Sequence, residues 1–223
     1  MNDHDTMMDE GVIDSDQAPI RPGEEWANAL THGLAALSGL ILGSWLVSTA
    51  LNQGFGLAIA CAAYTTSAVA TFSFSTLSHA IFRQPLLNTL RAWDQAMIYA
   101  MISGTYTPII YRFAADTTRT PLLTAIWVAA FLGITGKLLL RHRVNNVATV
   151  SYLLLGWLPA IPMYGRVPLE LGWGMLLGGV LYSLGVIVLL NDSKIRYMHV
   201  VWHLFVMSAA LCHFLSIRWY VVG

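Results

Sequence analysis

Long apolar segments dominate this sequence and restrict the folds open to it. Crossing the hydrocarbon core of a bilayer as a helix takes roughly 20 mostly apolar residues. The alternating polarity of a β-barrel strand is absent from these segments. We therefore predict an all-α membrane protein, a bundle of seven transmembrane helices. The predicted spans are residues 30–50, 57–82, 91–113, 120–140, 147–164, 168–190 and 198–221.

The distribution of charge agrees with this fold class. Only 11% of the residues are charged, against about 25% in soluble proteins. Most of the acidic residues precede residue 26, in a polar stretch that contains two prolines. We predict a disordered acidic tail at 1–23 and a seven-helix transmembrane domain at 24–223. The two cysteines, Cys61 and Cys212, lie in separate apolar segments and predict neither a disulfide framework nor a Cys-rich metal site.

Basic residues in the connections predict the orientation. We count eight on the side of the N-terminus and four on the opposite side. Basic loop residues favour the cytoplasmic face. We therefore expect a cytoplasmic N-terminus and an external C-terminus, the reverse of a G-protein-coupled receptor.

Four ionisable residues inside the predicted spans are candidates for a functional site, because such residues are costly in a membrane. His79 lies near the end of the second span, Asp94 at the start of the third, and His199 and His203 at the start of the seventh. In the predicted topology, all four lie at one level, inside the cytoplasmic leaflet. The bundle could therefore bring them together.

The chemistry of these residues suits a metal ion. His199 and His203 are four residues apart, which places both imidazoles on one helix face, a spacing used by helical zinc sites. His79 would be the third ligand and would leave one position for water, the pattern of catalytic zinc. Asp94 would partner that water, and Ser75, one turn before His79, could hydrogen-bond a ligand, the water or a substrate. A proton relay through the same residues is the main alternative.

Several of these residues also have purely structural interpretations. Asp94 could stabilise the start of a helix through the helix dipole, and Ser75 could serve helix packing. His213 lies ten residues beyond His203, about 15 Å along a helix. We predict it to be a buried histidine that is hydrogen-bonded to a neighbouring helix.

The segment EEWANALTHG, residues 24–33, carries a second polar group before the first span. Glu25, Asn28 and His32 share one helix face at spacings of three and four. Pro22 and the early acids are typical of a helix start. We predict a short interfacial helix whose role is structural rather than catalytic.

Together these motifs carry a family resemblance. They are EEWANALTHG before the first span, Ser75–His79, DQAMIYAMISGTYTP from Asp94, and HVVWHLFVMSAALCHF from His199. In order and spacing they resemble the bacterial hemolysin III branch of the progestin and adipoQ receptor family, over essentially the whole chain after the tail. The resemblance implies seven helices with a cytoplasmic N-terminus.

The resemblance also implies a zinc ion held by His79, His199 and His203 near the cytoplasmic face. Asp94 matches the family aspartate that contacts the water on zinc, and Ser75 matches the family serine. Related alkaline ceramidases use such a site to hydrolyse a lipid amide. The long cytoplasmic domain of the animal receptors is not present in this sequence.

We therefore expect a zinc-dependent hydrolase of a lipid amide or ester, in the bacterial inner membrane, that contributes to lipid homeostasis. Its expected partners are membrane lipids and a lipid substrate or free fatty acid, and no nucleic acid. The alternative is a non-enzymatic or receptor-like protein with structural zinc. A haemolytic pore is less favoured, because a pore needs polar or charged residues along one face of several spans and these spans have few of them. Imidazoles also bind nickel, copper and iron, so the sequence leaves the metal open.

Overall fold

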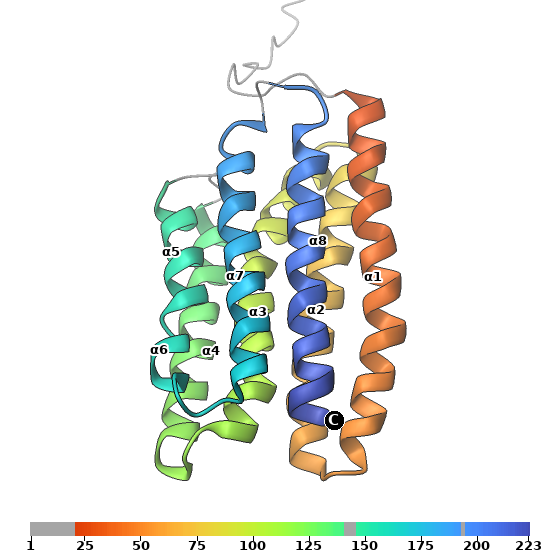
Figure 1. The fold of residues 1–223 in the computed structure, drawn as a ribbon. Helices are drawn as coiled ribbons and strands as arrows, with labels where there is room; N and C mark the ends of the chain where they lie inside the picture. The colour runs from red at the N-terminus through yellow and green to blue at the C-terminus, as the bar shows by residue number, and fades with distance from the viewer. Residues whose placement is uncertain (1–20, 141–145, 193–194) are drawn as a thin grey trace, which may run out of the picture.

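The computed structural model describes residues 21–140, 146–192 and 195–223, and every element in these residues is a helix (Figure 1). This confirms the predicted all-α bundle of seven long helical segments. Most of the predicted acidic tail lies outside the described residues. The helices are α1 (Pro22–Leu51), α2 (Phe55–Ala80), α3 (Leu86–Phe113), α4 (Asp116–Leu140), α5 (Asn146–Trp157), α6 (Ala160–Met163), α7 (Leu169–Leu189) and α8 (Met198–Ile217), which ends in a π-helical turn, Arg218–Val222.

Among the described residues, five helices are long and apolar enough to cross a membrane: α1, α2, α4, α7 and α8 with its final turn. Their outer faces carry large exposed apolar side chains, such as Ile41 on α1, Phe131 on α4 and Ile187 on α7. A soluble monomer rarely exposes such a continuous apolar surface. These faces therefore suit contact with lipid chains.

The α3 helix is more polar because it lies inside the bundle, where it packs against α2, α4, α5 and α8 (Figure 1). Ser103 and Thr107 are buried in it, and their hydroxyls donate to the carbonyl oxygens of Ile126 at 2.9 Å and Ser103 at 2.7 Å. Gly104 lets α2 approach closely, since a Cβ there would lie 2.7 Å from the Cβ of Ser67. The helix continues through Pro108, which neighbouring helices make possible in a membrane bundle.

Two predicted segments differ from the structure. The expected span 147–164 is interrupted, because α5 ends at Trp157 and Pro159 precedes the short α6. Proline lacks the N–H that a continuing helix needs. Residues 24–33 are not a separate interfacial helix but the first turns of α1, which begins at Pro22.

The beginning of α1 holds the beginning of α8. One Glu24 carboxylate oxygen accepts from Arg196 Nε at 3.1 Å, and the other accepts from the Tyr197 backbone N–H at 3.3 Å. Tyr197, the residue before α8, has a left-handed backbone with φ of 60°. This tie fixes the first turn of α8 beside α1. The start of α1 and the C-terminus lie at opposite ends of the bundle (Figure 1), as an odd number of spans requires.

Candidate metal centre

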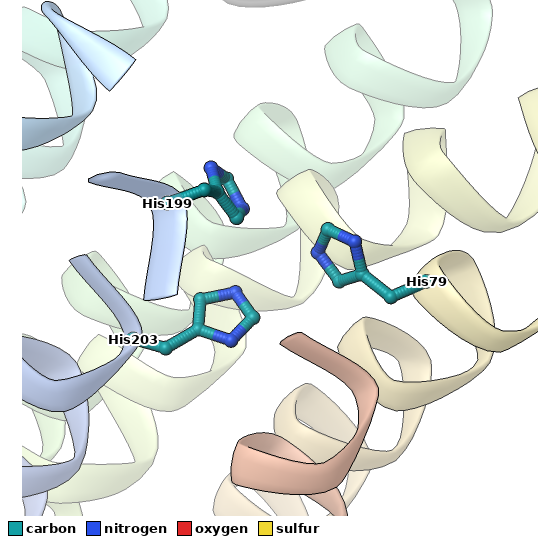
Figure 2. A group of neighbouring side chains, drawn as sticks. All are labelled: His79, His199 and His203. Atoms are coloured by element: carbon teal, nitrogen blue, oxygen red, sulfur yellow. The ribbon is translucent and has the colours of Figure 1, made fainter. Parts of the chain in front are cut away.

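Three histidines from two helices meet near one end of the bundle. His79 comes from the last turn of α2, and His199 and His203 come from the first turns of α8. One ring nitrogen of each lies within 4.8 Å of the others, and the three rings surround a common space (Figure 2). His203 is only 1% exposed and His79 is 8% exposed. The predicted convergence of these residues is confirmed.

Two of these rings have a carboxylate at Nδ1, the ring nitrogen closer to the backbone. His79 Nδ1 lies 2.5 Å from Glu25 Oε2, and His199 Nδ1 lies 2.7 Å from Asp192 Oδ2. The other oxygen of Glu25 lies 3.5 Å from the Arg91 guanidinium. A carboxylate on the far nitrogen of a metal-binding histidine is a recurrent feature of metal sites, because it orients the ring.

The third ring is held by α1. His203 Nδ1 lies 3.0 Å from Thr31 Oγ1. His32, the next residue of α1, stacks on His203 with ring centroids 3.5 Å apart and an angle of 4° between the planes. The first turns of α1 therefore pack directly on the histidine cluster.

Ser75 contacts this extra histidine. Its Oγ lies 2.7 Å from His32 Nδ1, and the two residues are 2% and 4% exposed. We predict a structural role for Glu25 and His32 from the sequence, and the structure places both in contact with the site, Glu25 on His79 and His32 on His203. The available signal was the general one that an ionisable residue inside a span is costly, and it applies to His32, which lies within the predicted span 30–50.

Asp94 lies on the neighbouring helix α3. Its Oδ2 accepts a hydrogen bond from Ser78 Oγ at 3.0 Å. Asp94, Ser75, His199 and His203 line one cavity, whereas His79 is not among its lining residues.

That cavity has a volume of about 710 Å³. Its lining residues run from His199 and His203 along α3, α5, α7 and α8 to Pro168, at the connection before α7. Beyond the cluster its walls are mostly apolar, with residues such as Ile109, Leu153 and Leu176. The polar site therefore lies at one end of a long apolar chamber.

The donor set fits a divalent metal ion. Three imidazoles are a common set for zinc, and a Zn–N distance of about 2.0 Å places ligand nitrogens roughly 3.3 Å apart. The widest pair here needs to close by only about 1.5 Å on that basis, within the reach of side-chain rotation. Among the described residues, His79 Nε2 is buried without a hydrogen-bond partner, which suits a metal ligand, and the same holds for the neighbouring His32 Nε2.

His213 belongs to a different part of the bundle. It is buried in α8, and its Nε2–H donates to the Met175 carbonyl oxygen of α7 at 3.2 Å. This confirms the prediction of a buried histidine that is hydrogen-bonded to a neighbouring helix. It lines the same cavity at a more distant point.

Comparison with known proteins gives consistent matches over the whole transmembrane region. The profile of the family described as "Haemolysin-III related" matches residues 21–214. Hemolysin-3 of Bacillus cereus is 33% identical over 204 residues, covering 89% of this chain and 92% of that protein. The monocyte to macrophage differentiation factor of Homo sapiens is 28% identical over 207 residues, covering 89% of this chain and 84% of that protein. This chain is therefore an integral membrane protein that belongs to the haemolysin-III related family.

Proposed function

We propose that this protein is a metal-dependent hydrolase that cleaves an amide or ester bond of a membrane lipid. The observation that carries the proposal is the shared cavity. His199, His203, Asp94 and Ser75 line one end of it, and mostly apolar side chains line the rest. Its volume of about 710 Å³ lies within the usual range of ligand pockets, about 300–1,000 Å³.

In this proposal, different residues of the chain have different chemical roles. A divalent ion held by His79, His199 and His203 would supply Lewis-acid activation of water and of the lipid carbonyl. The Asp94 carboxylate would hold the attacking water and accept its proton. Ser78 Oγ lies 3.0 Å from Asp94 Oδ2 and 2.9 Å from the Ser75 carbonyl oxygen, so its hydroxyl would help to position the carboxylate when it donates to Asp94.

Ser75 would stabilise the negative charge that develops on the carbonyl oxygen. When His32 Nδ1–H donates to Ser75 Oγ across their 2.7 Å contact, the serine keeps its own hydroxyl proton for the substrate. The apolar chamber would hold an acyl chain and exclude bulk water, with the scissile bond beside the histidines. Membrane lipids would be the substrates and a free fatty acid a product.

Fatty acid release by the purified protein in lipid bilayers tests this function. We expect metal-dependent release from lipid amides or esters, and we expect Asp94→Asn to slow it about 100-fold or more, since a general base typically contributes that much. Asp116→Asn is the matched control, because Asp116 is an exposed acid at the start of α4. Equal rates for the two variants, at equal metal content, would contradict the role of Asp94.

Substitution of Ser75 tests the oxyanion role separately. We expect Ser75→Ala to lower kcat by about 100-fold with little change in KM, because one oxyanion donor contributes about that factor in the transition state. Thr76→Val is the control, since the Thr76 hydroxyl donates to the Phe72 carbonyl of its own helix. An unchanged kcat in Ser75→Ala would remove the serine from the mechanism.

A non-enzymatic role is the second candidate, in which the metal only joins α2 to α8. The names of the relatives favour it, because "Hemolysin-3" and "monocyte to macrophage differentiation factor" do not name an enzyme. Metal removal would then lower the melting temperature, while no lipid would be cleaved under any condition. Leakage of a dye from vesicles would instead indicate a lytic activity.

A further inference from the structure

We propose that Glu25, Asp192 and Thr31 are positioning residues that fix the tautomers of the three clustered histidines. Each would hold Nδ1 as the protonated nitrogen, which leaves the Nε2 lone pair of all three rings for one divalent ion. The inference deepens the proposed function and rests on the metal site within it.

The protons of the two carboxylate contacts can be assigned from the chemistry of the groups. An ionised carboxylate has acceptors and no donor. His79 Nδ1 and His199 Nδ1, at 2.5 Å and 2.7 Å from such oxygens, must therefore carry the hydrogen. A neutral imidazole has one N–H, so the Nε2 of each ring has the free lone pair.

The Thr31 contact indicates the same tautomer for His203, because of the acceptors that surround the Thr31 hydroxyl. The Thr31 hydroxyl has one proton, and its Oγ1 lies 2.8 Å from the Asn28 carbonyl and 3.1 Å from the Ala27 carbonyl. Both carbonyls are acceptors, so the hydroxyl proton is directed towards the backbone. Oγ1 must then accept from His203 Nδ1–H at 3.0 Å, and Nε2 of His203 is unprotonated.

The orphaned nitrogen supports this assignment. His79 Nε2 is buried and has no hydrogen-bond partner within the described part of the chain. A buried nitrogen lone pair without a partner is costly in a folded protein. The cost is removed when the nitrogen ligates a metal. A hydrogen bond from Nδ1–H, together with an unpartnered lone pair on Nε2, is therefore the arrangement of a histidine that is ready to bind a metal.

This arrangement explains how α1 takes part in the site without supplying a ligand. Glu25 and Thr31 lie six residues apart in its first turns and reach His79 on α2 and His203 on α8. Asp192, between α7 and α8, holds the remaining ring. Partners of this kind orient a ring and increase the basicity of its metal-binding nitrogen, and their loss typically weakens metal binding about 10- to 100-fold.

Metal affinity tests the proposal without any substrate. Zinc binding to the full-length protein in micelles is measured by competition with a chromophoric chelator. We expect Glu25→Gln and Asp192→Asn each to weaken binding about 10- to 100-fold, because a neutral amide is a weaker acceptor and can present its NH₂ to the ring. The losses should multiply in the double variant, since the two residues hold different histidines.

Asp116→Asn is the control and should bind zinc as the wild type does. Wild-type affinity in both Glu25→Gln and Asp192→Asn would overturn the proposal. A protein whose affinity depends on these residues but that releases no fatty acid would overturn the hydrolase function and leave this inference standing.

The tautomers can also be read directly in the wild type. Nitrogen-15 NMR of metal-free protein with labelled histidines distinguishes Nδ1–H from Nε2–H rings. We expect the Nδ1–H form for His79, His199 and His203, and a change confined to His79 in Glu25→Gln. An Nε2–H ring at any of the three positions in the wild type would refute the assignment. If a variant fails to fold, this measurement on the wild type still tests the assignment of the tautomers.

Discussion

We expect replacement of His203 with alanine to abolish both zinc binding and the proposed lipid hydrolysis. His203 is the most deeply buried ring of the cluster and belongs to the group whose nitrogens lie within 4.8 Å of one another. Loss of an outer partner typically costs 10- to 100-fold in affinity, and loss of a direct ligand costs more. We expect affinity to fall by well over 100-fold on that scale, measured as bound zinc per protein after chelator competition, and fatty acid release to fall to background.

His213→Ala is the matched control for this experiment. It removes the same residue type from the same helix, but His213 bonds the Met175 carbonyl rather than the cluster. We expect His213→Ala to retain wild-type zinc content. If His203→Ala and His213→Ala bound zinc equally well, the assignment of the cluster as a metal centre would be wrong.

We expect Gly178→Ala to destabilise the bundle at the contact between α7 and α8. A Cβ at residue 178 would lie 2.2 Å from His213 Nε2, far inside van der Waals contact. The ring has little freedom to move, because it is buried and its Nε2–H is held by Met175. Overpacking of a core typically costs about 1–3 kcal/mol. We expect a loss of that size in unfolding free energy, measured by denaturant titration in micelles.

Two further variants separate this clash from a general effect of alanine. Gly172→Ala lies on the same helix, and its Cβ would meet Val167 at an ordinary 3.9 Å. We expect it to be neutral or slightly stabilising, since alanine favours a helix over glycine by about 0.5–1 kcal/mol. The double variant Gly178→Ala/His213→Ala should be more stable than the sum of the two single losses predicts. Strict additivity would show that the cost of Gly178→Ala arises elsewhere.

The long apolar helices could be read from the sequence because the membrane acts on each segment almost independently. Hydrocarbon thickness sets the length, and the cost of a charge in lipid limits polar residues to the ends or the interior. The same rules, with the predicted topology, brought His79 to the level of His199 and His203. The orientation of the chain across the membrane stays a prediction from the basic loop residues.

The apolar pattern was less informative where a segment contacts protein on all sides or contains proline. The α3 helix, predicted as the span 91–113, is less apolar than the five long apolar helices, and its Ser103 and Thr107 hydroxyls donate to backbone carbonyls within the bundle. The fifth predicted span appears continuous by hydropathy, yet Pro159 divides it into α5 and α6. Hydropathy measures the preference for lipid and contains no term for backbone hydrogen bonds.

The residues that hold the histidines could not be predicted from spacing. Glu25 and Thr31 reach residues 54 and 172 positions away, and their contacts depend on how α1 is rotated against α2 and α8. Sequence periodicity defines the faces of one helix but does not state which neighbour each face meets. For this reason the sequence leaves open whether the polar face of residues 24–33 caps the cytoplasmic mouth of the bundle or lies in the headgroups.

The sequence by itself determined the all-helical membrane fold and the three candidate metal-binding histidines, because hydropathy and helical spacing are local properties. Only the tertiary structure decided which side chains hold those histidines, which space they share with Asp94 and Ser75, and why His213 stands apart. These are consequences of packing. The Nδ1 partners of the histidines and the apolar chamber beside them exist only after distant helices come together, and no local pattern in the chain encodes their rotation.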